Sequence, residues 1–402
     1  MLTKEANERL TRIGPGTPMG NVMRRYWHPI ATSGELAEEP VLAVKLLGEN
    51  LVLYRSPNGD LGMVAERCPH RGASMAYGIP EDGGLRCPYH GWKFSSEGAC
   101  LEQPAEPQDS TFKHRVRIPA YPVQELAGMI WAYLGPEPVP LLPRWDILVR
   151  PDLHREIGIT RLPVNWLQAA ENSMDPVHLE YLHGMYMNYV LKRQGKEPIA
   201  SVKHHEKIGF EVFEFGIYKR RLLTGQSEDA EDWRVGHPQL FPATLSLGTP
   251  DRPRLEFRIP QDDEHTMIYS LFTRQAAPGE VVPAEVPIYD VPYKHEDGRL
   301  VVDTILGQDQ MTWVTQGTIS DRTTERLGSS DKGIILYRSV MMEQIERVER
   351  GEDPLGVIRD PAQNENLSVG REAGAHYQTG SFMPATDYED ALEVVRGKRY
   401  QH

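Results

Sequence analysis

The sequence has few cysteines, no long apolar run and no excess of positive charge. Its 402 residues include only 3 cysteines, Cys68, Cys87 and Cys100. This argues against a disulfide framework and for a metal or redox role of the clustered pair. No segment approaches the length of a membrane span, and MLTKEANERL at the N-terminus lacks a signal-peptide core. A net charge of −13 disfavours nucleic acid as a partner. We therefore expect a cytoplasmic protein that does not cross a membrane.

What the chain does contain is enough apolar sequence for two ordinary cores. Hydrophobic residues make up 40% of it and charged residues 25%, as in soluble globular proteins. We predict a helical segment over 1–25, a small antiparallel β domain over 26–140 and a second domain over 141–402. Proline-rich PEPVPLLPRW forms the stiff boundary between the two domains. In the second domain, a helical block around 165–190 precedes alternating strands over about 200–275, and two helical stretches follow residue 300.

Two cysteines of the first domain are each followed closely by a histidine. The spacing is Cys-x-His, sixteen residues, then Cys-x-x-His, and both pairs lie in loops rich in proline and glycine. Two such loops can hold one metal centre between them. A structural zinc with two cysteines and two histidines is the alternative to a redox centre. Replacing half the thiolates of an iron–sulfur cluster by neutral imidazoles removes negative charge and raises its potential.

The residues around these pairs favour the redox centre. CPHRG followed by CPYHGW resembles the two-loop motif of Rieske [2Fe–2S] domains. The resemblance implies that Cys68 and Cys87 bind one iron of the cluster, and that His70 and His90 bind the other. Cys100 lies outside the motif and is read as an ordinary small residue.

A second group of candidate ligands lies in NWLQAAENSMDPVHLEYLHG, residues 165–184. Asp175 and His178 are three apart and share a helical face, whereas His178 and His183 are five apart and would point about 140° away from each other on an ideal α-helix. The helix must deviate if both histidines bind one metal. Pro176 removes a backbone donor, and Gly184 is suited to ending the helix directly after His183.

The pattern E-N-x-x-D-x-x-H-x-x-x-x-H after such a motif resembles the mononuclear site of Rieske non-haem iron oxygenases. The resemblance implies Fe²⁺ bound by His178, His183 and a late carboxylate, with one face open to dioxygen and substrate. LGQDQMTWVTQG resembles the helix that supplies this carboxylate, which favours Asp309 and leaves Asp303 as the alternative. Its position before DRTTERLGSSD matches the phthalate-dioxygenase-like branch. Asp321 and Asp331 are interpreted as surface ion pairs or loop caps.

This family implies an α+β oxygenase subunit, with an all-β Rieske domain followed by a helix-grip (START-like) catalytic domain on an antiparallel sheet. A flavin or iron–sulfur reductase would pass electrons through the cluster to the ferrous iron, and O₂ would then oxidise an aromatic substrate, such as an aromatic carboxylate or aryl ether. The family also implies a homotrimer, or a multiple of it. In that ring each cluster faces the neighbouring subunit's iron, and Asp175 bridges the interface.

Residues that contact substrate are harder to choose. Asn172 lies in the histidine motif, and either Arg220 or Arg221 is suited to clamp a carboxylate. Because successive strand residues face opposite sides, at most one arginine is expected in the pocket. A solvent-facing basic pair is the alternative. Four apolar and aromatic residues after His183 suit either an aromatic-binding cavity or ordinary core packing: Met185, Tyr186, Met187 and Tyr189.

Two other classes of protein remain open from the sequence. One is an electron carrier with a structural second domain, and the other is a helix-grip ligand-binding module without iron. Both leave the grouping of Asp175, His178, His183 and Asp309 without a chemical purpose. The sequence leaves open cis-dihydroxylation, monohydroxylation and oxidative dealkylation as outcomes.

Overall fold

The computed structural model describes residues 1–199 and 203–368. Its first part has three short helices, ten strands and two 3₁₀ turns. The second of these turns, η2 (Phe112–Arg115), lies between β8 and β9. In chain order the elements are α1 (Lys4–Thr11), α2 (Pro18–Met23), β1 (Trp27–Thr32), α3 (Ser33–Glu38), β2 (Val41–Leu46), β3 (Glu49–Arg55), β4 (Leu61–Ala65), η1 (Met75–Tyr77), β5 (Ile79–Glu81), β6 (Gly84–Arg86), β7 (Lys93–Phe94), β8 (Cys100–Glu102), β9 (Val123–Leu126) and β10 (Met129–Tyr133).

The second part is built on one large sheet with helices before, within and after its strands. Its elements are α4 (Asp146–Val149), β11 (Leu153–Leu162), α5 (Trp166–Asn172), the π-helix η3 (Leu179–Tyr186), α6 (Met187–Arg193), β12 (His205–Phe213), β13 (Gly216–Leu223), α7 (Glu231–Arg234), β14 (His237–Leu240), β15 (Thr244–Thr249), β16 (Arg252–Pro260), β17 (Thr266–Gln275), β18 (Ile288–Asp290), α8 (Ile305–Thr315), η4 (Ser329–Asp331), α9 (Lys332–Glu349) and η5 (Pro361–Gln363).

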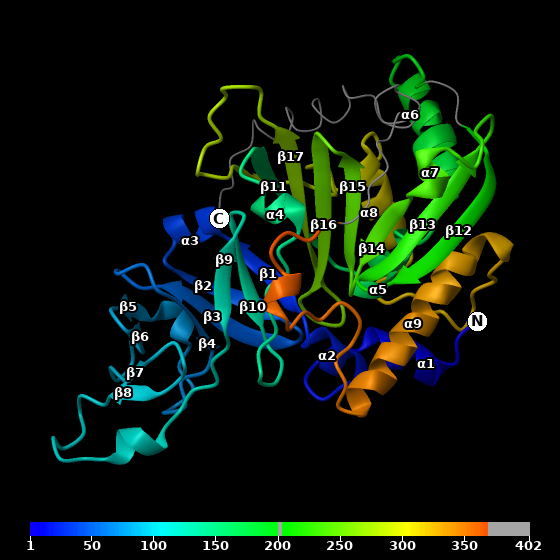
Figure 1. The fold of residues 1–402 in the computed structure, drawn as a ribbon. Helices are drawn as coiled ribbons and strands as arrows, with labels where there is room; N and C mark the ends of the chain where they lie inside the picture. Colours follow the sequence, from blue (N-terminus) through cyan, green and yellow to red (C-terminus); the bar gives the residue numbers. More distant parts are fainter. Residues whose placement is uncertain (200–202, 369–402) are drawn as a thin grey trace.

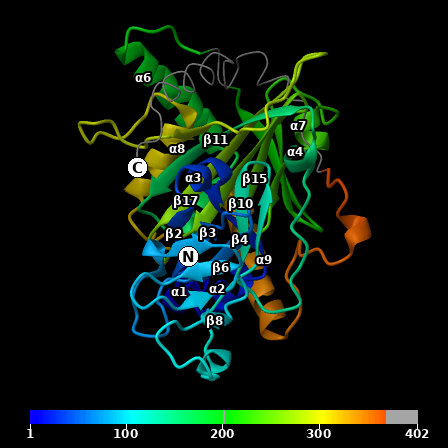
Figure 2. The ribbon, with the colours of Figure 1, turned by 90° about the vertical axis from the view of Figure 1, so that its left-hand side faces the viewer.

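Three small antiparallel sheets form the N-terminal domain, as the sequence predicts. They have the orders β1-β10-β9, β2-β3-β4 and β5-β6-β7-β8. The third sheet carries the two Cys/His loops and rests on a small apolar core that includes Val52, Val64 and Phe94. Figures 1 and 2 both place β5 to β8 at one end of the molecule, far from α6 and α8.

The C-terminal domain has an eight-stranded sheet of order β12-β13-β14-β15-β16-β17-β11-β18. All neighbours pair antiparallel except β11 and β18, which are parallel. The predicted antiparallel sheet is therefore confirmed with one exception, and β11 is a strand that the sequence analysis did not assign. The two predicted late helices are α8 and α9.

The large sheet packs on both faces. On one face of β16, Phe257 meets Trp131 of β10 with ring centroids 5.2 Å apart, which joins the two domains through apolar packing. On the other face, the guanidinium of Arg258 lies 5.5 Å from the ring centroid of Trp313 on α8. We call this second side, which faces α8, the inner face of the sheet.

Helices α1 and α2 pack on α5 and α9 of the C-terminal domain. Helix α2 contacts α9, and the side chain of Asn165, at the start of α5, donates to the Thr11 carbonyl at 3.0 Å. The chain enters the β domain at Trp27, whose indole N–H donates to the Pro140 carbonyl at 2.9 Å. The points where the chain enters and leaves the β domain therefore lie side by side. Within the described residues, no helix is long and apolar enough to cross a membrane.

Two candidate metal centres

The two Cys/His loops fold alike. Each begins at a buried cysteine, whose carbonyl accepts a hydrogen bond from a glycine N–H four residues later: Gly72 to Cys68 at 2.8 Å and Gly91 to Cys87 at 3.1 Å. Both glycines have positive φ, +74° and +72°, a backbone conformation that a side chain would strain. The glycines therefore let each loop turn back tightly over its cysteine.

The loops bring all four predicted cluster residues to one place. Cys68 and Cys87 are each 2% exposed, and burial, with the nearby Cys87 as a smaller contribution, raises the pKa of Cys68 to about 11. The rings of His70 and His90 have centroids 4.4 Å apart, and His70 stacks on Trp92 at 4.3 Å. Two buried sulfurs beneath two half-buried imidazoles fit a cluster with mixed ligands, because a metal deprotonates coordinating thiols outright.

The second candidate centre depends on an unusual helix. Residues 179–186 form a π-helix, which bonds residue i to i+5, so positions five apart lie on one side. His178, which caps this helix, and His183 consequently have ring centroids 5.1 Å apart. The expected departure from α-helical geometry therefore occurs. The expectation that Gly184 ends the helix is wrong, because its carbonyl accepts from the N–H of Met187 and the chain continues into α6.

Helix α8 adds a carboxylate to the two histidines. Asp309 Oδ1 lies 3.2 Å from His183 Nε2 and 3.6 Å from His178 Nε2. One donor atom from each residue lies within 4.8 Å of the others, which suits a single ion. Burial alone would raise the pKa of Asp309, but the adjacent His183 and His178 lower it overall. This is a two-histidine, one-carboxylate set of the kind that binds ferrous iron with open positions.

Asp175 lies in the break between α5 and η3, so the predicted shared helical face with His178 is wrong. Proline at 176 and the turn around it interrupt the helix there. Asp175 Oδ1 accepts from the Val177 N–H at 2.8 Å and caps this turn. Its Oδ2 lies 3.7 Å from His178 Nδ1. The carboxylate therefore has one oxygen in a cap and the other near the histidine.

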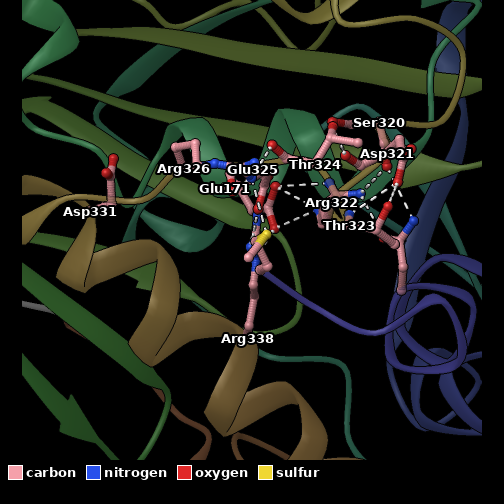
Figure 3. Close-up of polar contacts among 12 residues, drawn as sticks. Glu171, Ser320, Asp321, Arg322, Thr323, Thr324, Glu325, Arg326, Asp331 and Arg338 are labelled. Carbon is pink, nitrogen blue, oxygen red and sulfur yellow. Dashed lines mark hydrogen bonds and ion pairs between the residues drawn. The ribbon is translucent and has the colours of Figure 1, made fainter.

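The other late carboxylates lie elsewhere. Asp303 accepts a hydrogen bond from Gln194 at 3.1 Å. Asp321 accepts from the N–H and the hydroxyl of Thr323 (Figure 3), and Asp331 accepts from the Gly328 N–H at 2.6 Å. Asp321 and Asp331 are thus loop caps, one of the two interpretations that the sequence offered.

A buried ion-pair network supports the end of α5 next to its contact with Asp309. Glu171 accepts from Arg322 at 2.8 Å and from Arg338 at 2.6 Å, and Arg338 also binds Glu325 (Figure 3). The next residue, Asn172, directs its amide toward Asp309 Oδ1 at 3.4 Å. Residue spacing in the sequence does not reveal this network, because its four charges come from three separate segments. The network fixes the helix end that carries Asn172.

The two predicted substrate arginines have opposite orientations. Arg221 is 1% exposed and lies 3.5 Å from Asp232, whereas Arg220 points outward to the carbonyls of Trp233 and Arg234. At most one therefore faces the interior, as the strand alternation predicts. Met185 and Tyr189 are 63% and 54% exposed. These two side chains therefore lie on the surface, and they neither line a cavity nor pack in the core.

One buried pair near the histidines was missed from the sequence. Glu180, on η3, accepts hydrogen bonds from the His205 N–H at 2.5 Å, His205 Nδ1 at 2.6 Å and His204 Nδ1 at 2.9 Å. It thereby links η3 to the start of β12. Its position two residues after His178 was the only available signal, and spacing alone does not reveal a partner on another element.

Comparisons with known proteins agree with this geometry. Residues 26–122 match the Rieske [2Fe-2S] domain family, and residues 297–369 match a family described as LigXa C-terminal domain like. The chain is 42% identical over 374 residues to the 5,5'-dehydrodivanillate O-demethylase oxygenase subunit of Sphingobium sp., covering 92% of this chain and 86% of that protein. It is 31% identical over 398 residues to the phthalate 4,5-dioxygenase oxygenase subunit of Pseudomonas putida, covering 89% of each.

Solved structures establish the fold. NdmA of Pseudomonas putida, in a mutant with caffeine, superposes with a TM-score of 0.62 at 21% identity, covering 86% of this chain and 99% of that one. The carbazole-bound oxygenase of carbazole 1,9a-dioxygenase, in complex with ferredoxin, also gives 0.62, at 18% identity, covering 90% and 98%.

A two-loop Cys/His domain in front of a two-histidine, one-carboxylate centre defines an oxygenase of the Rieske type. The chain belongs to the Rieske non-haem iron aromatic-ring oxygenases, in the phthalate-dioxygenase-like branch, as an oxygenase subunit. Its cofactors are a [2Fe–2S] cluster and a mononuclear iron.

Proposed function

We propose that this enzyme O-demethylates an aromatic substrate that carries a carboxylate. The observation that carries the proposal is the His178, His183 and Asp309 set beside a sheet face rich in buried cations, in a chain 42% identical to an O-demethylase subunit. In this reaction one atom of O₂ enters a methyl C–H bond of an aryl methyl ether. The resulting hemiacetal breaks into a phenol and formaldehyde. The other oxygen atom leaves as water, with two electrons from the reductase and two protons.

The ligand assignments belong to the same proposal. Cys68 and Cys87 hold one iron of the cluster, and His70 and His90 hold the other. His178, His183 and Asp309 hold the mononuclear iron, and the distances among their donor atoms support this. When bound, the cluster supplies single electrons and the ferrous iron supplies open positions for O₂.

The inner face of the sheet supports an anionic substrate. Residues that pair across neighbouring strands share a face of the sheet, and so do alternate residues along one strand. Glu256 pairs with Leu245, Leu245 with Gln239, and Gln239 with Ile217. This register places five charged residues on the inner face. They are Lys219, Arg221, Arg254, Glu256 and Arg258, and all are buried. The two arginines of β16 share Glu256 at 3.4 and 3.2 Å, so these three side chains carry one net positive charge.

Buried cations of this kind suit a carboxylate, which forms strong charge-assisted hydrogen bonds with arginine. We assign the carboxylate contact to Arg221 rather than to Arg220, because Arg221 is the one inside. Asn172 is the proposed substrate contact nearest the iron, since its amide lies beside Asp309.

The quaternary part of the proposal is a ring of three subunits, or a multiple of it. Figure 1 shows β5 to β8, the sheet that carries the cluster loops, well apart from α8 in one chain, which favours electron transfer between subunits. Both regions expose apolar side chains suited to an interface: Tyr77, Ile79 and Tyr89 by the cluster loops, and Tyr181, Met185 and Tyr189 on η3 and α6. Asp175 would bridge His178 to a cluster histidine of the neighbour. We also place the enzyme in the cytoplasm with a flavin or iron–sulfur reductase, as cysteines that form no disulfide suit a reducing compartment.

The proposal is tested by incubating the chain and a reductase with methoxylated aromatic acids under ¹⁸O₂. The matched controls are the same compounds as amides. Formaldehyde together with an unlabelled phenol, formed faster from the acid than from the amide, is the expected result. A labelled ring product would replace demethylation by ring hydroxylation. Absence of any oxidised product from a protein with about three irons per chain would reject methoxylated aromatic acids as its substrates.

A further inference from the structure

Gln308 precedes Asp309 in α8 and contacts the opposite edge of the same imidazole. Its side chain is fully buried, at 0% exposure, and its Oε1 lies 2.9 Å from His183 Nδ1. Asp309 Oδ1 lies 3.2 Å from Nε2 of the same ring. Two consecutive residues of α8 therefore approach the two nitrogens of His183.

The orientation of the Gln308 amide is set by its other partners. Its Nε2 donates to the Val302 carbonyl at 2.9 Å and contacts the sulfur of Met187 at 3.5 Å. A carbonyl only accepts, so the amide nitrogen must face Val302 and the amide oxygen must face His183. That oxygen also only accepts, so Nδ1 of His183 must carry the proton. Nε2 is then left with its lone pair, directed to the side where Asp309 lies.

The second histidine lacks this support. His178 Nδ1 is buried without a hydrogen-bond partner, and the nearest carboxylate oxygen, on Asp175, is 3.7 Å away. His178 and His183 therefore differ within the described structure. The ring of His183 is tied to α8, whereas the ring of His178 is oriented by packing and by its place at the start of η3.

We propose that Gln308 is a positioning residue for the mononuclear iron. It holds His183 in the tautomer that offers Nε2 to the metal, and it joins η3 to α8 so that His183 and Asp309 approach the ion at a fixed separation. Partners of this kind on the far nitrogen of a ligating histidine orient the ring and tune its basicity. An amide does so without adding a second negative charge to the site. The inference rests on the proposed function, because it requires His183 to be a ligand.

Three variants test this role in the full-length protein with its cluster in place. Gln308→Met keeps the length of the side chain and removes both the acceptor and the donor. Gln308→Glu keeps an acceptor for His183 and loses the donor to Val302. Gln310→Met is the matched control, because Gln310 is a buried glutamine on the same helix, at 1% exposure, that donates to Thr160 at 3.2 Å instead of contacting a histidine.

The measurement is the affinity of the mononuclear site for Fe²⁺. The site is emptied with a chelator that leaves the cluster absorption unchanged, and Fe²⁺ binding is then followed in competition with that chelator. We expect Gln308→Met to bind Fe²⁺ about 10- to 100-fold more weakly. Gln308→Glu should recover most of the affinity, and Gln310→Met should stay within about twofold of the parent.

The outcomes separate this inference from the proposal beneath it. Parent-like affinity in Gln308→Met would overturn the positioning role, and so would equal losses in the Gln308 and Gln310 methionine variants, which would indicate general packing. Failure of Gln308→Glu to recover affinity would also overturn it, since the acceptor alone would then not matter. If the parent itself bound no Fe²⁺ outside its cluster, the ligand assignment of His183 would fail instead.

Discussion

His183 Nε2 and Asp309 Oδ1 lie 3.2 Å apart although 126 positions separate the two residues in the chain. The contact joins η3 to α8, and it places a carboxylate beside an imidazole in a largely buried position. Burial has the largest single effect and lowers the pKa of His183, but Asp309 and Gln308 together outweigh it, so the net shift is upward. A positive ion in the same place would interact with both groups.

Removal of Asp309 should therefore empty the mononuclear site without disturbing the cluster. In Asp309→Ala we expect Fe²⁺ affinity to fall by more than about 100-fold and turnover to be lost, because one of three protein ligands is gone. Metal analysis and the visible spectrum of the cluster check this. Asp303→Ala is the control. Retained mononuclear iron in Asp309→Ala, or its loss in Asp303→Ala, would transfer the ligand role to Asp303.

The π-helix predicts an asymmetry between adding and removing a residue. Deleting the exposed Tyr181 leaves the histidines four apart, a spacing that an α-helix places on one face. Inserting an alanine after Tyr181 leaves them six apart and rotates His183 away. We expect the deletion to keep Fe²⁺ affinity within about tenfold and the insertion to lose more than about 100-fold. Equal losses in both would show that the five-residue spacing itself is required.

Asp175→Asn separates the two contacts of that side chain. The amide oxygen can still cap the Val177 N–H, while the amide nitrogen replaces the oxygen beside His178. We expect both metal centres to remain filled and electron transfer from cluster to iron to slow by about 100-fold, as for a misplaced reacting group. Rapid mixing of the reduced protein with oxygen and substrate measures this rate. A rate near that of the parent would mean that Asp175 serves only as a cap.

The network around Glu171 predicts a pH dependence of stability. Burial opposes ionisation of Glu171, but Arg322 and Arg338 outweigh it and hold its pKa below the ordinary value of 4.5. A lowered carboxyl pKa stabilises the fold fully above the unfolded value, and this contribution is lost as the pH falls toward and through the folded value.

Glu171→Gln should accordingly cost about 3 to 5 kcal/mol at pH 7, because two buried arginines lose their shared partner. The difference from the parent should shrink as the pH drops below 4.5. Denaturant unfolding of both proteins across this range measures it. Glu352→Gln, at an exposed pair with Arg350, is the control and should change nothing measurable. A difference that stays constant with pH would exclude the ionised form of Glu171 as the cause.

The sequence predicted the features that depend on local spacing. The Cys/His loops and the need for a non-α helix between His178 and His183 follow from residue type and short separations. Side-chain contacts between segments far apart in the sequence could not be predicted in this way. Glu180 meets His205 of β12, and Glu171 meets Arg338 of α9, through tertiary packing alone. The prediction that Gly184 ends the helix is wrong because a glycine also fits inside a π-helix, where Gly184 is buried and the chain continues.

The hydrogen bond between the Trp27 indole and the Pro140 carbonyl gives the chain an unexpected modular plan. The polypeptide starts on one module, departs at Trp27, builds the other and comes back next to its point of departure. The electron-transfer module is thus an insert with adjacent ends, an arrangement that tolerates domain exchange. Chimeras that swap this insert between relatives should join at these two residues. The incoming insert should also have a tryptophan at the position of Trp131, because the contact of Trp131 with Phe257 holds the insert against the large sheet.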